Sequence, residues 1–289
     1  MRRIALLLLL LTACEREPTT LDVSYGQTLV HAMLSAGDSL AAVLITTSAP
    51  GPENVWLKIT EKPVSGARVQ LESLSGRVEL VNAATDDACT GFPPSLTENP
   101  DLAEGCYLGV VAGGIQPGVR YTLAIDLPSG RKVTGATTVP FPPSFTAPAA
   151  GAQIMTGGTQ GGQEPTHVRW AGTDKAPYVT LVAGIVDEPA CNVQLRSDLF
   201  GLFLVQQVTP FDSVALQSIA VSCPGQSQPV QRAAELVLTA YDSTYAEYII
   251  GGFDGSRTNV KASAGLSGAW GVFAASASAR LPVTFVPAP

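Results

Sequence analysis

The sequence predicts an all-β fold built from two tandem β-sandwiches, with one short helix in the second. Three observations support this prediction. Apolar and polar residues alternate along many short segments, which is typical of half-buried strands. The chain has 28 Gly and 22 Pro among its 289 residues, enough for many turns but fewer than signal disorder. Only 14% of the residues are charged.

The first sandwich is expected over residues 21–139. Its clearest alternating segments are residues 67–72, 77–80, 121–126 and 132–134. Turn residues separate these segments, namely Ser75-Gly76 and Pro128-Ser129-Gly130. Because one sheet cannot bury its apolar face alone, such strands predict two sheets packed against each other.

A proline-rich segment marks the expected domain boundary. Residues 140–150 contain four prolines, which lack the amide donor that a central strand needs. We therefore expect a linker at 140–150 and a second β-rich domain over residues 151–289. The strand-like segments of that domain are residues 167–171, 178–186, 200–208, 218–222, 235–240, 269–275 and 281–286.

One helix is expected within the second domain. Tyr241, Tyr245 and Tyr248 recur at helical spacing, and Asp242 stands where a capping residue would. Thr244 and Glu247 have the spacing of a capping box.

The first 14 residues predict a lipoprotein signal. Two arginines precede eight apolar residues, and Leu11-Thr12-Ala13-Cys14 follows with small residues before a cysteine. Residues 1–13 would be removed, Cys14 would carry acyl chains, and residues 14–20 would form a polar tether. An ordinary signal peptide containing a cysteine is the alternative. The apolar run is too short to span a bilayer, which needs about 20 residues.

The mature chain would be acidic. Removing residues 1–13 leaves 15 basic against 24 acidic residues, a formal charge of −9. This charge argues against nucleic-acid binding and against adhesion to anionic lipid, which both need clustered Lys and Arg. The membrane contact would therefore depend on the lipid. Glu15 leaves the choice of membrane open, since an acidic residue after the acylated cysteine favours the inner membrane in some bacteria.

Four further cysteines suggest disulfides, because the environment outside the inner membrane is oxidising. They are Cys89, Cys106, Cys191 and Cys223. Three pairings are possible, and Cys89–Cys106 with Cys191–Cys223 is the one that keeps each bond within one expected domain. Zinc is the alternative, but the sequence offers neither CxxC spacing nor a neighbouring histidine.

The sequence gives no clear sign of catalysis. The two histidines, His31 and His167, lie in strand-like segments, and no G-x-S-x-G motif is present. A carboxylate pair from distant positions stays open, since such pairs leave no local pattern. We predict no catalytic residue, metal or cofactor.

Four other features each have a structural and a functional interpretation. The acidic residues between Asp86 and Glu104 could hold calcium or form a solvated loop. Residues 157–162 are glycine-rich and suit a hairpin tip better than a phosphate cradle. The apolar segment 199–205, with Phe203, suits a buried strand or a strand that pairs with a partner protein. The tryptophans are more often core residues than sugar platforms, and they are Trp56, Trp170 and Trp270.

The order of several motifs resembles a known bacterial lipoprotein family. Residues 63–71 (Pro-Val-Ser-Gly-Ala-Arg-Val-Gln-Leu) resemble a strand of immunoglobulin-like and carboxypeptidase-regulatory-like modules. Gly105-Cys106-Tyr107, residues 118–123 and residues 128–133 follow, and the Tyr-rich segment 241–248 and residues 258–260 and 268–274 echo a second half. This order resembles the family called domain of unknown function 4249. The resemblance implies Ig-like sandwiches and a lipid-anchored protein associated with outer-membrane nutrient import, and it implies no catalytic residues.

From these observations we expect a non-enzymatic cell-envelope module, lipid-anchored at the outer membrane, that acts as an accessory to an outer-membrane transporter. A direct ligand-binding protein for glycan or peptide, with its site on loops of the second domain, is the alternative. A lipid-anchored hydrolase is the third.

Overall fold

The computed structural model describes residues 26–50, 59–83, 89, 100–158, 165–173, 176–188, 190–197, 204–207, 212–224, 231–253 and 263–287. The signal at 1–13, the acylation site Cys14 and the tether at 14–20 lie outside the described residues. In the described part of the chain, no helix has the length and apolarity that crossing a membrane requires.

The fold is all-β, as the sequence predicts, and the described residues contain one α-helix, α1 (Ser243–Phe253). The strands of the first half are β1 (Thr28–Ser35), β2 (Leu40–Pro50), β3 (Ile59–Pro63), β4 (Arg68–Ser73), β5 (Gly76–Asn82), β6 (Cys106–Val110), β7 (Arg120–Asp126) and β8 (Lys132–Thr138). A 3-10 helix at Pro100–Gly105 leads into β6.

The strands of the second half follow after the proline-rich segment. They are β9 (Ser144–Ala147), β10 (Gln153–Gly158), β11 (Thr166–Ala171), β12 (Tyr178–Ile185), β13 (Asn192–Ser197), β14 (Leu204–Gln207), β15 (Ser213–Ser222) and β16 (Arg232–Tyr241). After α1 come β17 (Ser263–Ala264), β18 (Leu266–Ser267) and β19 (Trp270–Pro287).

The first sandwich has one sheet of β6, β2, β1 and the beginning of β19, with β3 and β17 alongside. The other sheet contains β5, β4, β7, β8 and β18. The alternating residues of both sheets meet in one hydrophobic cluster that includes Val30, Val43, Tyr107, Leu123 and Phe273. This is the packing of two apolar faces that the period-two pattern predicts.

The second sandwich is built in the same way. One sheet contains β14, β12, β16, the end of β19 and β10, and the other contains β9, β11, β15 and β13. Its core includes Trp170, Leu181, Leu216, Leu236 and Phe285.

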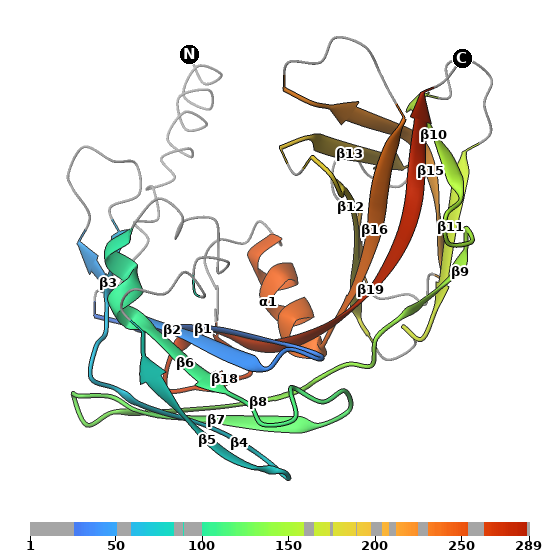
Figure 1. Cartoon of the computed structure of the whole chain (residues 1–289). Coiled ribbons are helices and arrows are strands. Elements are labelled where there is room, and N and C mark those ends of the chain that lie inside the picture. The colour runs from blue at the N-terminus through green and yellow to red at the C-terminus, as the bar shows by residue number, and fades with distance from the viewer. Residues whose placement is uncertain are drawn as a thin grey trace, which may run out of the picture.

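The strand β19 belongs to both sandwiches (Figure 1). Residues 270–276 pair in parallel with β1, whereas residues 276–285 pair antiparallel with β16 and residues 284–287 in parallel with β10. We expected two strands here, at 269–275 and 281–286. The structure has one strand of 18 residues, because no Gly, Asn or Pro interrupts the chain between Gly271 and Pro282.

This pairing also corrects the expected domain limits. Residues 263–276 were assigned to the second domain, but they pair within the first sandwich, with β1 and β8 as partners. The expected linker at 140–150 contains β9, which pairs with β11. The four prolines of this segment lie before and after β9, so each residue of the strand keeps its amide donor.

Helix α1 lies on the concave side of the molecule, between the two sandwiches (Figure 1). The predicted cap is confirmed, because the Tyr245 amide donates to Oδ1 of Asp242 at 3.1 Å. The predicted capping box of Thr244 and Glu247 is wrong. The cap at Asp242 places both residues inside the helix, where Thr244 cannot be the capping residue.

Gly271 allows β19 to lie beside β1. Its φ angle is +105°, and a Cβ atom there would lie 2.1 Å from the carbonyl oxygen of Val30. We expect Gly271→Ala to lower the free energy of unfolding by about 3 kcal/mol, from the steric clash and the positive φ together.

The control is Gly130→Ala, at φ +82° with nothing within 4 Å of the added methyl group. This variant should lose only about 1 kcal/mol, from backbone strain alone. Urea unfolding measures both losses. Equal losses in the two variants would show that the approach of β19 to β1 is not tightly constrained.

Candidate functional site

A cleft of about 690 Å³ lies where the two sandwiches meet. Its first wall comes from the start of β7, the end of β8 and the segment after β8, and includes Arg120, Thr138 and Phe141. Gly172 and Ala176, between β11 and β12, contribute from the second sandwich. The start of α1 completes the lining. We expected a ligand site on loops of the second domain, whereas this cleft draws on both sandwiches.

Asp242 anchors three elements beside the cleft. Its Oδ1 accepts hydrogen bonds from the amides of Tyr245 (3.1 Å) and Ala275 (3.2 Å), and its Oδ2 accepts one from the Thr137 hydroxyl. The residue is only 8% exposed. Its carboxylate therefore joins α1, β19 and β8, and protein donors already occupy both of its oxygens.

Phe141 provides an apolar surface in the cleft. The residue is 63% exposed, although it is a large aromatic side chain. Its ring packs on Gly118, where a Cβ atom would lie 2.7 Å from Cζ of the ring. The glycine thus leaves room for the ring to lie against the start of β7.

Arg120 is the cation of the cleft. It is the first residue of β7, it lies opposite Thr138 in the β7–β8 register, and it is exposed. No ion pair in the described part of the chain involves Arg120. The described lining residues therefore supply a guanidinium, several hydroxyls and one aromatic ring. Their titratable side chains are Arg120 and Asp242.

Three tyrosines fix α1 against the second sandwich. Tyr241 and Tyr245 stack with ring centroids 4.3 Å apart, and Tyr178 meets both rings edge-on, at 5.4 and 5.6 Å. Burial, followed by the neighbouring Tyr241, raises the pKa of Tyr245 to about 12. Burial also raises the pKa of Tyr178. These ring contacts pack α1 against β12 and β16.

His31 lies under the other side of α1. It is buried in β1, its ring meets that of Tyr248 edge-on at 6.4 Å, and Glu61 is its charged neighbour. Oε2 of Glu61 accepts a hydrogen bond from the Thr46 hydroxyl at 2.9 Å. Burial lowers the pKa of His31, although the Glu61 carboxylate acts in the opposite direction.

The structure contains two disulfides, Cys89–Cys106 and Cys191–Cys223, which is the pairing that stays within each half of the chain. Cys89 and Cys106 are buried with Leu44 and Leu108 on the outer face of the first sandwich. Cys191 and Cys223 adjoin Asn192 and Ser222, which face each other at the ends of β13 and β15.

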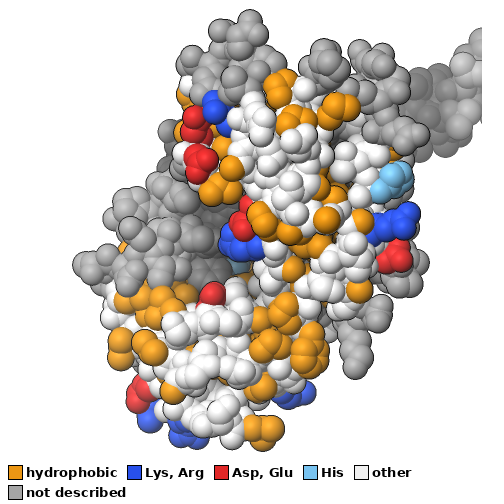
Figure 2. Space-filling view, turned by 45° about the vertical axis from the view of Figure 1, so that its right-hand side comes forward, with side chains coloured by type: hydrophobic (Ala, Val, Ile, Leu, Met, Phe, Trp, Pro, Cys, Tyr) orange, Lys and Arg blue, Asp and Glu red, His pale blue; other side chains and the backbone are white. Residues whose placement is uncertain are grey.

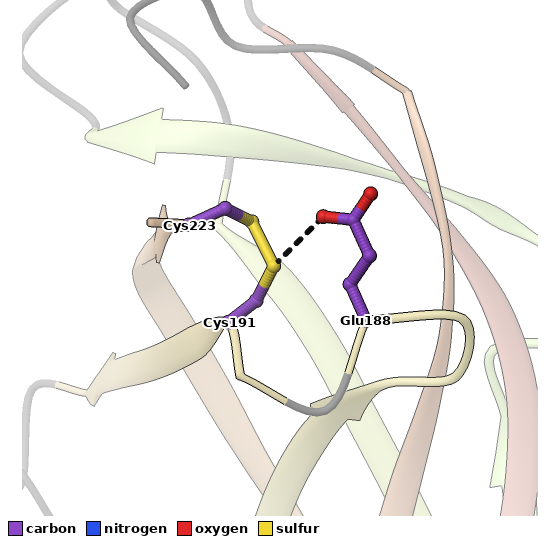
Figure 3. A group of neighbouring side chains, drawn as sticks. All are labelled: Glu188, Cys191 and Cys223. Carbon is purple, nitrogen blue, oxygen red and sulfur yellow. Dashed lines mark hydrogen bonds between the residues drawn. A yellow bond between two sulfur atoms is a disulfide. The ribbon is translucent and has the colours of Figure 1, made fainter. Parts of the chain in front are cut away.

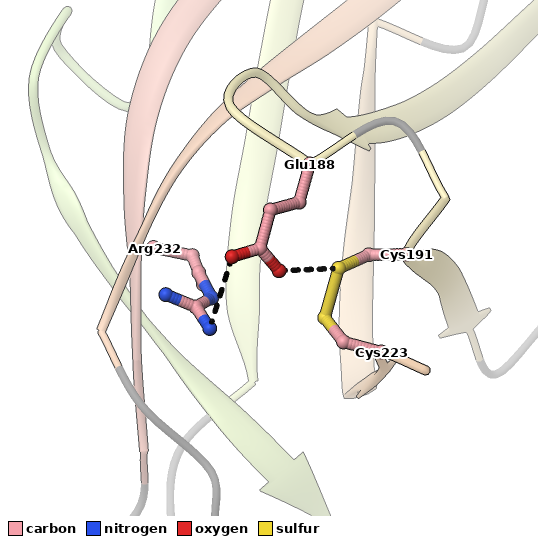
Figure 4. Close-up of a disulfide and its surroundings, with 4 residues drawn as sticks. All are labelled: Glu188, Cys191, Cys223 and Arg232. Carbon is pink, nitrogen blue, oxygen red and sulfur yellow. Dashed lines mark hydrogen bonds and ion pairs between the residues drawn. A yellow bond between two sulfur atoms is a disulfide. The ribbon is translucent and has the colours of Figure 1, made fainter. Parts of the chain in front are cut away.

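The carboxylate of Glu188 lies between the second disulfide and the Arg232 guanidinium (Figures 3 and 4). Its Oε2 lies 3.3 Å from Sγ of Cys191, and its Oε1 lies 3.5 Å from the Arg232 guanidinium. The side chains of Glu188, Cys191 and Cys223 lie as close to one another as the ligands of a metal ion do. Because the sulfurs are bonded to each other, they lack the thiolate that zinc needs, and the group is a disulfide with a neighbouring ion pair.

The other residues with both a structural and a functional interpretation do not come together. His31 lies in β1 of the first sandwich and His167 in β11 of the second. Trp170 is buried in the core, as expected, whereas Trp270 is 41% exposed. Gly157 and Gly158 lie in β10 and pair with β15.

Several other sequence features fall outside the described residues. They are Trp56, Phe203, residues 159–162 of the glycine-rich segment, and the acidic positions Asp86, Asp87 and Glu98. Of the apolar segment 199–205, the structure describes its end in β14, which pairs with β12. Glu104 of the acidic segment is exposed.

On the face shown in Figure 2, acidic and basic side chains are scattered in small mixed groups. The described residues of that face form no basic patch. Several large apolar side chains of the described residues are exposed, and Leu40, Val81 and Val110 are among them. Leu40 lies opposite Val110 in the β2–β6 register, and Val81 lies opposite Leu108, two residues from Val110.

Sequence reasoning missed the cleft. Its residues come from segments separated by more than 100 positions, and no local pattern joins them. One signal was available. Phe141 stands between Pro140 and Pro142, where an alternating strand cannot bury it, and this position indicates an exposed ring.

Comparisons with known proteins give little information about this chain. No protein-family model matches the sequence, and no curated protein matches it. A cycloalternan-degrading enzyme from Trueperella pyogenes, solved in complex with cycloalternan, aligns over 86% of this chain and 34% of its own, with a TM-score of 0.26 and 11% identity. The ICAM-5 ectodomain fragment aligns over 89% of this chain and 53% of its own, with a TM-score of 0.17 and 12% identity. This chain thus spans about a third and about half of those chains, and TM-scores this low carry no argument.

The burial of His31 predicts a pH-dependent stability. Because its pKa is lowered in the folded state, the unfolded chain binds more protons below about pH 6.5. The contribution of His31 is therefore present above that pH and is lost as the pH falls through the folded pKa. We expect the free energy of unfolding to fall between about pH 7 and about pH 5, and His31→Gln to flatten this slope.

Urea unfolding across that pH range measures the slope. His167→Gln, at an exposed position of β11, is the control for the loss of one histidine. If His31→Gln has the same slope as the unmodified protein, groups other than His31 cause the pH dependence.

Proposed function

We propose that this protein is a lipid-anchored binding module of the cell envelope that holds a small ligand in the cleft between its sandwiches. One observation carries the proposal. The cleft of about 690 Å³ combines the exposed ring of Phe141 with the Arg120 guanidinium and the hydroxyls of Thr138 and Ser243. Ligand sites typically have this composition, with apolar surface for affinity and a few polar groups for orientation.

The chemistry of the cleft supports binding over catalysis. A carboxylate pair for hydrolysis needs two acids across a substrate bond, and Asp242 is the acidic side chain of the described lining. Protein donors occupy both oxygens of Asp242, so it is poorly placed to transfer a proton. The residues that remain can hold a ligand and orient it.

Three features support the proposed location in the cell envelope. The sequence Leu11-Thr12-Ala13-Cys14 fits lipid attachment at Cys14, and we propose the outer membrane as its destination. Two disulfides suit an oxidising compartment. The resemblance to domain of unknown function 4249 stays a prediction and points to the same location.

A second candidate function is that of an accessory to an outer-membrane transporter. The observation that favours it is the apolar surface formed by Leu40, Val81 and Val110 on three neighbouring strands. Val81 and Val110 are 66% and 70% exposed, and side chains of this type on one sheet face suit contact with a protein partner.

The binding function predicts that Phe141 contributes to affinity. We expect at least one probe from a panel of oligosaccharides and tripeptides to raise the melting temperature of the mature protein. Phe141→Ala should then weaken the binding of that probe about tenfold, because aromatic contacts contribute up to about 1.5 kcal/mol.

The control is Leu74→Ala, which removes a fully exposed apolar side chain from the β4–β5 turn, outside the cleft. Isothermal titration gives both affinities. Equal affinity in the Phe141→Ala variant and the unmodified protein would place the binding site elsewhere.

The accessory function predicts a β-barrel transporter in crosslinked complexes purified with native lipid from envelope extracts. Val110→Glu should reduce its recovery severalfold, because a charge would be buried without a partner at the contact. Leu74→Glu, at the exposed turn, should leave recovery unchanged. Recovery of the lipidated protein alone would contradict the accessory function and leave the ligand-binding function in place.

A further inference from the structure

The charge state of the cleft follows from two side chains. Arg120 lines the cleft and has no ion-pair partner in the described part of the chain. Asp242 is the acidic side chain of the described lining, and it is 8% exposed and accepts hydrogen bonds from Tyr245, Ala275 and Thr137. It forms no ion pair with Arg120. The described lining thus offers Arg120 no carboxylate within ion-pair distance, and the guanidinium is available to a ligand.

The neighbouring strand adds polar groups next to Arg120. In β8, the Ala136 amide donates to the Gly265 carbonyl at 3.0 Å, on the edge away from β7. Thr138 lies two residues further, so its backbone amide and carbonyl point to the same edge. Thr138 lies opposite Arg120 in the register. Arg120 and Thr138 therefore present a guanidinium and a hydroxyl on the same face of the β7–β8 pair, and both residues line the cleft.

An apolar surface lies next to this polar group. Phe141 is three residues beyond Thr138, and its ring packs on Gly118, two residues before Arg120. The two chain segments that present the cation also present the ring.

We infer that the ligand of this cleft carries a carboxylate that pairs with Arg120, next to an apolar or sugar face that packs on Phe141. This inference rests on the proposed function and names its ligand chemistry. A guanidinium binds a carboxylate through two parallel hydrogen bonds, which fixes the orientation of the ligand as well as its charge. Two sources provide this chemistry at the size of the cleft, a uronic-acid oligosaccharide and a peptide with a free C-terminus.

The experiment uses the mature, lipidated protein in mild detergent and two matched pairs of probes. The first pair is trigalacturonic acid and its methyl ester, and the second is the tripeptide Ala-Ala-Phe and its C-terminal amide. Within each pair only the carboxylate changes. Isothermal titration measures the affinity for all four probes.

We expect the acid form of one pair to bind at least about tenfold more tightly than its uncharged form, and the pair that does so identifies the source. Arg120→Gln should weaken binding of that acid form about tenfold and leave the uncharged form unchanged within about twofold. Arg120→Lys keeps the charge but loses the paired geometry, so its affinity should lie between the two. Arg169→Gln, at an exposed position of β11 outside the cleft lining, is the control.

The other outcomes separate this inference from the proposed function. Equal binding of charged and uncharged probes, sensitive to Phe141→Ala but not to Arg120→Gln, would overturn the carboxylate and leave the cleft as the site. Tighter binding of an acid form that Arg120→Gln does not weaken would overturn the role of Arg120. Binding of no probe would overturn both the inference and the ligand-binding function. Circular dichroism and the melting temperature of Arg120→Gln show that the fold is intact.

Discussion

The shared strand β19 is the constraint on which the rest of the structure depends. One half of it pairs with β1, and the other half pairs with β16 and β10. Both sandwiches therefore form backbone hydrogen bonds with the same strand. A flexible linker would let two domains rotate freely. Here a continuous strand, with its pairing on both sides, fixes their relative orientation. The walls of the cleft therefore come from two sandwiches that cannot separate without breaking β19 pairing.

Asp242 extends this constraint from the strand to the helix. Its backbone amide donates to the Ala275 carbonyl, and its side chain accepts from Ala275, Tyr245 and Thr137. A single buried carboxylate thus links β19, the start of α1 and β8. The stacked ring of Tyr241 then holds the helix against the second sandwich. A buried carboxylate is tolerated at this junction because charge-assisted hydrogen bonds offset its desolvation. It forms these bonds and no ion pair with Arg120.

Sequence alone could predict the local features of this fold and little of its assembly. Period-two alternation located β4, β5 and β7, and the cap at Asp242 follows from residue type and position, because these signals lie within a few residues. The pairing of Val30 with Gly271 joins positions 241 residues apart, and nothing local specifies it. The prediction of two strands at the C-terminus failed for the same reason. Alternating Ala and Ser show that a strand is possible but not which sandwich it joins. The cleft depends on which sandwich the strand joins. The sequence alone therefore could not predict that Arg120 and Phe141 line one cleft.

The overall charge of the chain limits what the cleft can bind. At a formal charge of −7, the chain repels anions at long range, and this repulsion is screened beyond about 8 Å at physiological salt. Arg120 therefore acts at short range, after a ligand has entered the cleft. A simple inorganic anion gains only the guanidinium contact and has no surface to place on Phe141. A ligand that joins a carboxylate to an apolar or sugar face gains both contacts, and the second compensates for the unfavourable approach. The acidic composition of the chain and the Arg120 guanidinium of the cleft together favour composite ligands over free anions.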